Sequence, residues 1–147
     1  MEDKQFVITI NAPTSKVWGT LWGPDTYPQW TEPFCAGSHA EGEWQEGSKI
    51  LFMDPNRDGM VSTIVKLVPN EHLSFKMLGV INKGVEDYDS PAAKALAGGY
   101  ENYTLTEENG KTTLKCEVIG EMPPDIEQYL LAAWPKALDK LKEIAEQ

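Results

Sequence analysis

Two histidines, His39 and His72, are the side chains of this 147-residue chain that ordinarily titrate nearest to neutral pH. They fall on different predicted strands, and a zinc site needs three or four ligands at characteristic spacings. The sequence contains no such set, so we expect no metal. His39 would act as an acid or base if it reached a pocket, but an exposed or hydrogen-bonded strand histidine is the commoner arrangement. No catalytic residue is predicted.

Two loop segments imitate ion-binding or phosphate-binding loops without completing them. Asp54–Gly59 reproduces the first half of a calcium-binding EF loop, but Val65 occupies the twelfth position, where a bidentate Glu is required. Gly110–Thr112 is similar to the end of a phosphate-binding loop, but Leu105 stands where its first glycine belongs. We interpret both segments as hairpin turns. Because GxSxG and GxGxxG are also absent, no cofactor is expected.

Aromatic and apolar side chains are the remaining functional candidates, because they can line a cavity that buries a ligand. Each one taken alone is more simply a core residue. The methionines among them adapt readily to irregular shapes. Tyr88 and Tyr100 border a long connection, where a hydroxyl can contact a ligand. The predicted ligand-binding residues are Trp30, Phe34, Phe52, Met53, Phe75, Met77, Tyr88, Tyr100, Tyr103, Leu130 and Trp134.

Short strands joined by turn sequences carry most of these candidates. The alternating segment Gln5–Ile10 predicts a strand, followed by a helix capped by Thr14 or Ser15 and a helical turn over Asp25–Trp30. Asn-Gly and Asp-Gly pairs supply the positive φ angles of tight turns, so we expect an antiparallel meander. Its strands are predicted at Cys35–Trp44, Ser48–Asp54, Met60–Val68, His72–Val80, Glu101–Thr106 and Thr112–Ile119.

The connection Lys83–Gly99 interrupts this meander. Ser90 can cap a short helix, Pro91 suits its first position, and Gly98-Gly99 ends it. Both a lid over a pocket and a plain surface excursion agree with this sequence.

The C-terminal segment predicts a long amphipathic helix that begins at Pro124. Pro135 removes one backbone hydrogen bond inside this pattern, so we expect a kink near Leu131–Trp134. One broad apolar stripe follows helical spacing through Ile126, Tyr129, Leu130, Ala133, Trp134, Ala137, Leu138, Leu141 and Ile144.

The composition indicates a globular protein with an acidic surface. Its 23 Asp and Glu against 13 Lys and Arg give a formal charge of −10, which repels phosphate backbones and anionic lipids. We therefore expect no nucleic-acid partner and no membrane insertion. Neither a signal peptide nor a membrane-spanning run is visible, which predicts a cytoplasmic location. Cys35 and Cys116 are expected to be reduced, buried thiols.

The order of elements resembles the helix-grip fold of the SRPBCC or START-like superfamily. More closely, the chain resembles the branch named after the C-terminal domain of the heat-shock ATPase activator homologue (AHSA-like). Two departures leave local register and pocket shape open: Ala40–Trp44 lacks the Gly-Gly pair that is frequent in the family, and Lys83–Gly99 is longer than a hairpin. The similar text comprises Ile10–Trp18 (INAPTSKVW), Trp30, Glu46-Gly47, Val61–Leu73 (VSTIVKLVPNEHL), Tyr103–Leu105, Thr112–Leu114 and Trp134–Lys142 (WPKALDKLK).

The resemblance implies a single domain over residues 1–147. Its expected α+β architecture is a curved antiparallel sheet of about seven strands wrapped on the C-terminal helix, with two short helices after the first strand. Relatives use a cavity between sheet and helix for lipids, sterols, polyketides or hormones. The first hypothesis is therefore a cofactor-free module, monomer or dimer, that binds a small apolar or amphipathic molecule.

Two alternatives stay open. One is an enzyme of the cyclase or hydrolase kind that uses the same cavity, with a tyrosine, His39 or Asp54 transferring protons. The other is a stress-related, co-chaperone-like interaction module. The co-chaperones of this branch carry an additional N-terminal domain that this sequence does not include, so the resemblance alone does not support a chaperone partner.

Overall fold

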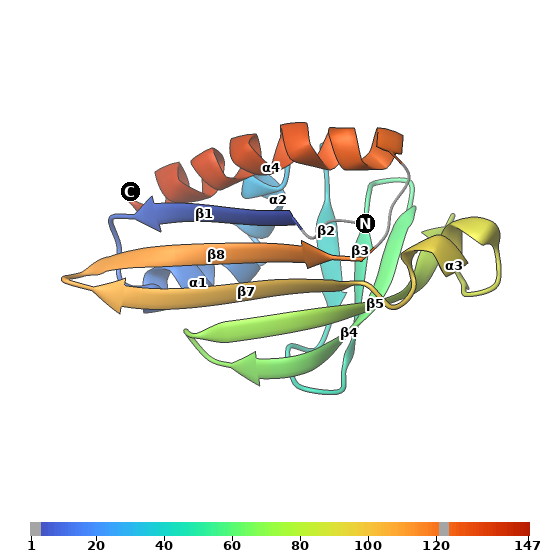
Figure 1. Cartoon of the computed structure of the whole chain (residues 1–147), viewed down its shortest axis with the longest axis horizontal. Coiled ribbons are helices and arrows are strands. Elements are labelled where there is room, and N and C mark those ends of the chain that lie inside the picture. Colours follow the sequence, from blue (N-terminus) through green and yellow to red (C-terminus); the bar gives the residue numbers. More distant parts are fainter. Residues whose placement is uncertain (1–3, 121–123) are drawn as a thin grey trace.

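The computed structural model of the chain describes residues 4–120 and 124–147. Its long C-terminal helix lies across a sheet whose strands run beneath it (Figure 1). The elements follow in the order β1 (Lys4–Ile10), α1 (Thr14–Trp22), α2 (Tyr27–Trp30), β2 (His39–Gly42), β3 (Lys49–Met53), β4 (Gly59–Val68), β5 (His72–Asn82), β6 (Val85–Asp87), α3 (Pro91–Leu96), β7 (Tyr100–Glu108), β8 (Lys111–Ile119) and α4 (Pro124–Ala145).

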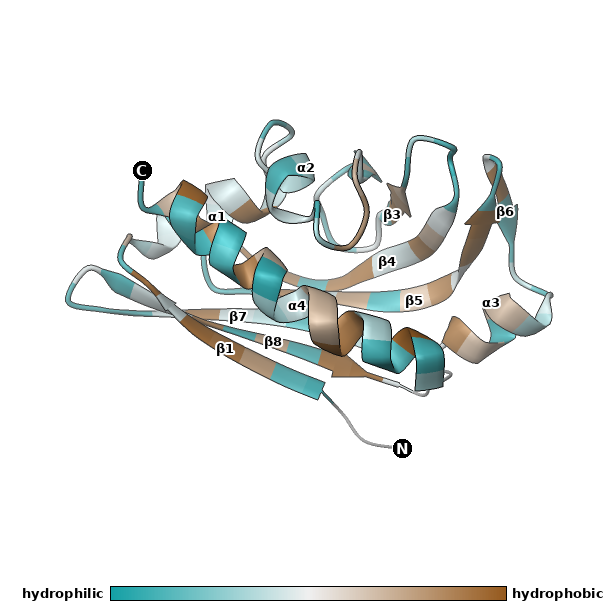
Figure 2. Cartoon of the chain, turned by 90° about the horizontal axis from the view of Figure 1, so that it is seen from above, coloured by the Kyte–Doolittle hydropathy of each residue, from teal (hydrophilic) through white to brown (hydrophobic). Residues whose placement is uncertain are grey.

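The described strands form one eight-stranded antiparallel sheet in the order β1-β8-β7-β5-β4-β3-β2, with the short β6 paired to β5. The register of β4 against β5 shifts between Val61 and Ser62 and again between Ile64 and Lys66. Such irregularities bend a strand and increase its twist. The sheet accordingly curves around the helices (Figure 2). The expected α+β helix-grip architecture is confirmed, with one short strand more than predicted.

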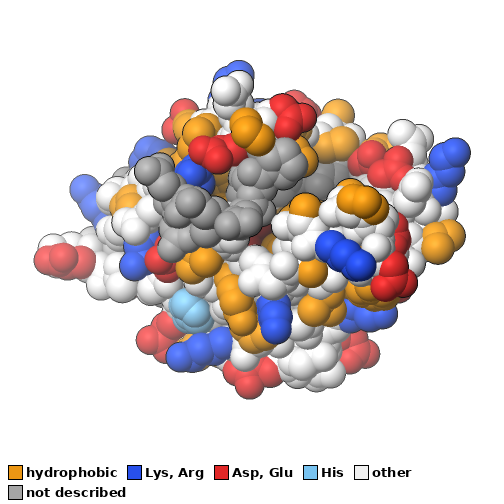
Figure 3. Space-filling view, turned by 45° about the vertical axis from the view of Figure 1, so that its right-hand side comes forward, with side chains coloured by type: hydrophobic (Ala, Val, Ile, Leu, Met, Phe, Trp, Pro, Cys, Tyr) orange, Lys and Arg blue, Asp and Glu red, His pale blue; other side chains and the backbone are white. Residues whose placement is uncertain are grey.

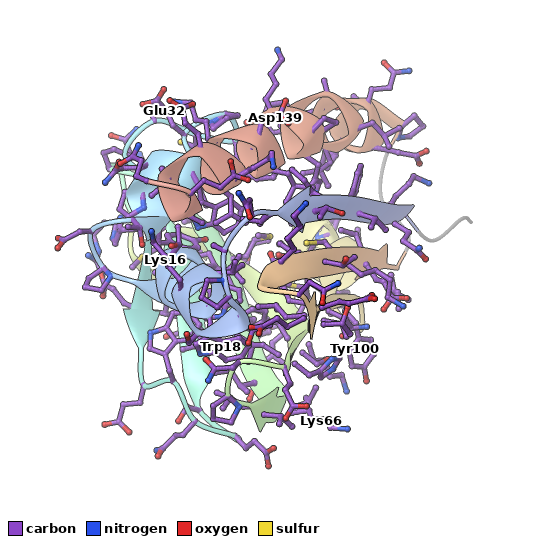
Figure 4. The ribbon with its side chains drawn as sticks, turned by 90° about the vertical axis from the view of Figure 1, so that its left-hand side faces the viewer. Lys16, Trp18, Glu32, Lys66, Tyr100 and Asp139 are labelled. Atoms are coloured by element: carbon purple, nitrogen blue, oxygen red, sulfur yellow. The ribbon has the colours of Figure 1, made fainter. Side chains whose placement is uncertain are left out.

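The long helix α4 packs against α1, α2 and β1 on the concave side of the sheet. Its buried side chains lie from the middle of the helix to its end, between Ala133 and Ala145. Asp139 lies on the exposed outer side of α4 (Figure 4). Nearby, the Nζ atom of Lys140 donates a hydrogen bond of 3.0 Å to Glu32, which links the helix to the segment after α2.

Aliphatic and aromatic side chains from every layer fill the core beneath the second half of α4. Each fully buried large side chain contributes roughly 1.5–3 kcal/mol through the removal of apolar surface from water. The largest side chains that are less than 2% exposed include Trp30, Phe75, Ile10, Leu21, Ile50, Ile64, Leu73, Leu114 and Leu141.

The predicted strands are confirmed at their centres and differ at their ends. The segment expected as Cys35–Trp44 is a strand only over His39–Gly42, because Gly37 adopts a positive φ of 79° within the preceding turn. The short strand β6 was not predicted. It forms when Lys83 (φ 51°) and Gly84 (φ 83°) turn the chain back along β5.

The two predicted helix caps have different outcomes. The cap of α3 is confirmed, since the Ser90 hydroxyl accepts a hydrogen bond of 3.2 Å from the backbone N–H of Ala93. The predicted side-chain cap of α1 is wrong. Glu107, which lies on β7, accepts a hydrogen bond of 2.8 Å from the backbone N–H of Thr14 instead. A carboxylate at this place also complements the positive end of the helix dipole.

Pro135 lies inside α4, which continues as a helix on both sides of it. The kink expected near Leu131–Trp134 stays a prediction. Both cysteines are free, as expected, but only Cys116 is buried, so the expectation that Cys35 is buried is wrong. Within the described ranges, no helix combines the length and the hydropathy needed to cross a membrane.

Candidate functional site

A cavity of about 460 Å³ lies between the concave face of the sheet and the first half of α4. Its volume falls within the roughly 300–1,000 Å³ range of small-molecule sites. Figure 3 views the molecule with the end that carries α3 brought forward. On this face, hydrophobic side chains lie beside acidic ones. Apolar lining residues include Tyr27, Trp30, Phe34, Phe52, Met53, Met60, Met77, Leu96, Tyr103, Val118, Ile119, Ile126, Tyr129, Leu130 and Trp134.

The two halves of α4 relate differently to the sheet, and this difference creates the cavity. In the second half, Ala137 and Leu141 are fully buried. In the first half, Ile126 and Tyr129 continue the same apolar stripe and line the cavity, yet they are 47% and 50% exposed. The stripe therefore faces packed side chains at one end of the helix and open space at the other.

Nine of the eleven residues predicted to bind a ligand line this cavity. They come from segments far apart in the sequence, and the curvature of the sheet brings them together under α4. The nine are Trp30, Phe34, Phe52, Met53, Met77, Tyr100, Tyr103, Leu130 and Trp134.

The other two predicted residues lie elsewhere. Phe75 is fully buried in the core, where its ring meets the ring of Phe52 edge-on at a centroid distance of 5.1 Å. Tyr88 is 42% exposed, and its hydroxyl donates a hydrogen bond to Glu86. Lys49 donates another hydrogen bond of 2.7 Å to the same carboxylate, so Tyr88 belongs to a surface polar group.

The wall nearest to α4 is built from aromatic rings around Trp134. Phe6 stacks on this indole at 5.4 Å between centroids, whereas Phe34 meets it edge-on at 5.1 Å. Tyr103 and Trp30 approach it at 6.1 Å and 6.5 Å. Trp134 is therefore the ring that joins the other four into one wall.

Glu101 is the most distinctive residue of the cavity, and sequence reasoning missed it. It lies opposite Phe75 on β5 and opposite Val118 on β8, so its side chain shares their face of the sheet. Tyr103 is two residues further along the same face, and its hydroxyl donates a hydrogen bond to the Glu101 carboxylate. The alternation Glu101-Tyr103-Leu105 was the available signal, since it places an acid on the apolar face of a strand.

Burial determines the ionisation of this group. Desolvation raises the pKa of Glu101, and the hydrogen bond from Tyr103 offsets part of that rise. Burial, followed by the negative charge of Glu101, raises the pKa values of Tyr27 and Cys116 and helps to raise that of Tyr103. The phenols and the thiol therefore stay protonated around neutral pH, which leaves Glu101 as the acid of this group.

The two histidines remain outside the cavity. His39 Nε2 lies 3.1 Å from a carboxylate oxygen of Glu41 on the exposed side of β2. His72 Nδ1 lies 3.0 Å from the hydroxyl of Thr104, and burial lowers its pKa. Asp54, the other proton-transfer candidate, does border the cavity. Within residues 4–120 and 124–147, no group of three or more His, Cys, Asp or Glu side chains is arranged to hold a metal ion.

Comparison with known families identifies one match over almost the whole chain. The family described as Activator of Hsp90 ATPase homolog 1-like protein matches residues 11–146. No curated protein matches at a significant level.

Solved structures show the same fold at low sequence identity. The Aha1 dimer from Colwellia psychrerythraea is 20% identical, with a TM-score of 0.77 over 99% of this chain and 97% of the other. DynU16, a putative protein in the dynemicin biosynthetic locus, is 18% identical with a TM-score of 0.73. This chain is covered completely in that match but spans only 48% of DynU16. CalU16 from Micromonospora echinospora is 17% identical, with a TM-score of 0.66 over 97% of this chain and 75% of the other.

Proposed function

Because the chain belongs to the Activator of Hsp90 ATPase homolog 1-like family, we propose that it uses the family's fold to bind a small, largely apolar molecule in the cavity under α4. The family and the neighbouring structures support a ligand-binding or co-chaperone-like fold. The observation that carries the proposal is the open space beneath the first half of α4, where apolar side chains line a cavity and remain partly exposed.

An empty cavity of this size lowers the stability of a small protein substantially. At roughly 24 cal/mol per Å³, an empty apolar void of 460 Å³ costs up to about 11 kcal/mol. Water entering an open cavity reduces this figure, but total stabilities are only about 5–15 kcal/mol. A ligand that replaces the water recovers part of that free energy through burial of its own apolar surface.

The polar groups of the cavity provide orientation. Glu101 and Tyr103 lie among aromatic walls, so a ligand buries its apolar body against the rings and turns one polar group toward this pair. Such an arrangement selects for molecules with one polar end.

A proton-transfer enzyme that acts in the same cavity is the second candidate function. The observation that favours it is the acid–phenol pair of Glu101 and Tyr103, because perturbed carboxyl groups in clefts are frequent general acids or bases. In this candidate function Glu101 and Tyr103 transfer the protons, a role for which the sequence suggested a tyrosine, His39 or Asp54.

A cavity-filling substitution tests the binding proposal. Val118 lines the cavity, so Val118→Trp should leave the fold intact while an indole occupies the ligand's space. Val7→Trp is the matched control, because Val7 is 56% exposed on the outer face of β1. We expect fluorescence titration with Nile red, an uncharged apolar dye, to show saturable binding to the wild type and Val7→Trp. Binding to Val118→Trp should be at least about 10-fold weaker.

The proposal is overturned if Nile red binds equally to all three proteins, or to none of them. Native mass spectrometry of protein purified from its own host provides the second readout. We expect an added small-molecule mass on the wild type that Val118→Trp lacks. Circular dichroism of both variants establishes that they are folded.

A further inference from the structure

The formal charges along the cavity wall are all negative. Among the described lining residues these charges belong to Asp54, Asp58 and Glu101, and no Lys, Arg or His accompanies them. The carboxylates of the two aspartates already accept hydrogen bonds from backbone N–H groups of neighbouring loops. Asp54 Oδ1 accepts hydrogen bonds from the backbone N–H groups of Asn56 at 2.8 Å and Asp58 at 3.0 Å. Asp58 Oδ1 accepts one from the backbone of Lys83 at 2.8 Å. Glu101 is left to face a ligand.

The hydrogen-bonding capacity of Glu101 exceeds what the described residues supply. Its donor is the Tyr103 hydroxyl, whereas an ionised carboxylate offers about four acceptor sites. The titratable groups that interact with it are Tyr103 on its own strand, Tyr27 on α2 and Cys116 on β8, and none of them is cationic. Lys4 on β1 shares this face of the sheet beyond Val118, and its Nζ atom lies 3.2 Å from a carboxylate oxygen of Glu127. From β5 the facing residue is the apolar Phe75. A partly buried carboxylate in such surroundings is stabilised by a cation that brings further donors.

The aromatic rings that line the same cavity as Glu101 favour the same sign of charge. Tyr27 stacks with Phe52 at a centroid distance of 6.2 Å, and Tyr103 approaches Trp134 at 6.1 Å. The faces of aromatic rings attract cations within about 6 Å of their centres and repel anions. The formal charge of −10 on the whole chain adds a long-range attraction for cations.

We infer that the cavity selects a monocationic amphiphile, in which an apolar body fills the aromatic end and one protonated amine lies against Glu101, Tyr103 and Tyr27. This inference rests on the proposed ligand-binding function and narrows its ligand class. Alkyl or aryl amines satisfy it. Fatty acids and other anionic amphiphiles do not, because they place a second carboxylate beside Glu101.

The pH dependence of binding follows from the same group. Burial raises the pKa of Glu101 in the free protein, so its carboxylate becomes ionised at higher pH than an exposed glutamate does. Affinity for a cation should therefore increase as pH rises through this raised pKa. It should fall again only where the amine itself loses its proton.

Three ligands with one alkyl chain test the inference: octylammonium, 1-octanol and octanoate, titrated by isothermal calorimetry at pH 7.5. We expect octylammonium to bind at least about 10-fold more tightly than 1-octanol, and octanoate more weakly than 1-octanol. Glu101→Gln should abolish the preference, so that octylammonium binds no more tightly than 1-octanol to this variant. Glu108→Gln removes the same charge from an exposed position on β7 and should keep the preference.

The possible outcomes distinguish failure of the cation preference from failure of the proposed ligand binding. If octanoate binds as tightly as octylammonium, or if Glu101→Gln retains the cation preference, the inference is wrong while apolar binding stands. If neither 1-octanol nor Nile red binds the wild type, the proposed function fails first. The wild-type ligand series decides the question by itself should Glu101→Gln not fold.

Discussion

Truncation of Trp134 perturbs the fold and the cavity together, and its two effects are separable. The indole is 3% exposed, and the rings of Phe6, Phe34, Trp30 and Tyr103 surround it at centroid distances of 5.1–6.5 Å. Removal of so buried an aromatic side chain costs about 3–5 kcal/mol. Against a total of about 5–15 kcal/mol, Trp134→Ala should remain folded in the cold with a much lower urea midpoint.

The same substitution removes one wall of the cavity. If a ligand loses contact with about 50 Å² of indole surface, roughly a quarter of what a buried aromatic side chain covers, it loses about 1.3 kcal/mol. That loss is about 10-fold in Kd. Leu141→Ala is the matched control, because Leu141 is fully buried on the same helix but does not line the cavity.

Urea denaturation and Nile red titration at 10 °C read the two effects. We expect both variants to be destabilised, since Leu141→Ala costs about 2–5 kcal/mol, but only Trp134→Ala to bind Nile red more weakly. Equal Kd values for the two variants would refute the role of Trp134 as a cavity wall. An unchanged free energy of unfolding for Trp134→Ala would refute the packing of α4 described above.

Three further predictions concern single groups. Glu101→Gln should equal the wild type in stability near pH 4 and exceed it near pH 8, because a raised carboxyl pKa lowers the free energy of unfolding as pH rises above the ordinary value of 4.5; urea titrations across pH measure this. Glu107→Ala should destabilise the fold by about 0.5–2 kcal/mol, because the backbone N–H of Thr14 loses its acceptor; Glu108→Ala is the control in the same thermal melts. Gly59→Ala should cost about 1–3 kcal/mol or more and weaken Nile red binding, because a Cβ atom would lie 1.8 Å from the carbonyl oxygen of Phe52 beside the cavity.

Each of these predictions has a clear contradiction. A constant stability difference between Glu101→Gln and the wild type across pH would mean that the buried carboxyl does not titrate abnormally. Identical melting temperatures for the Glu107 and Glu108 variants would mean that the carboxylate of Glu107 does not stabilise α1. A Gly59→Ala variant as stable as the wild type would contradict the close approach of β3 and β4.

Helices and turns were predicted well wherever the residues that determine them lie close together in the sequence. The cap residue Ser90, the turn at Asn109-Gly110 and the apolar stripe of α4 are all contained within a few turns or strands, and each is present in the structure. The cap of α1 could not be predicted in this way. Its acceptor, Glu107, lies 93 residues away, and only the antiparallel sheet brings it to the helix.

The candidate site was predicted in its apolar part and missed in its polar part. Leu130 and Trp134 follow from the apolar periodicity of the C-terminal helix, because a buried stripe can face a cavity as well as a core. Phe75 was chosen as an aromatic side chain on a predicted strand, but it lies in the core against other rings rather than at the cavity surface. Glu101 was passed over because acids on strands are usually solvated. Its position two residues before Tyr103 on the same face was the contrary signal.

Intermolecular nuclear Overhauser effects between 1-octanol and methyl-labelled protein test most directly whether a ligand occupies the space beneath the first half of α4. We predict contacts from the alkyl chain to the methyl groups of Val118 and Leu130, and none to Val7 on the outer face of β1. Contacts confined to Val7 and other outer-face methyl groups, with Val118 and Leu130 silent, would contradict the account.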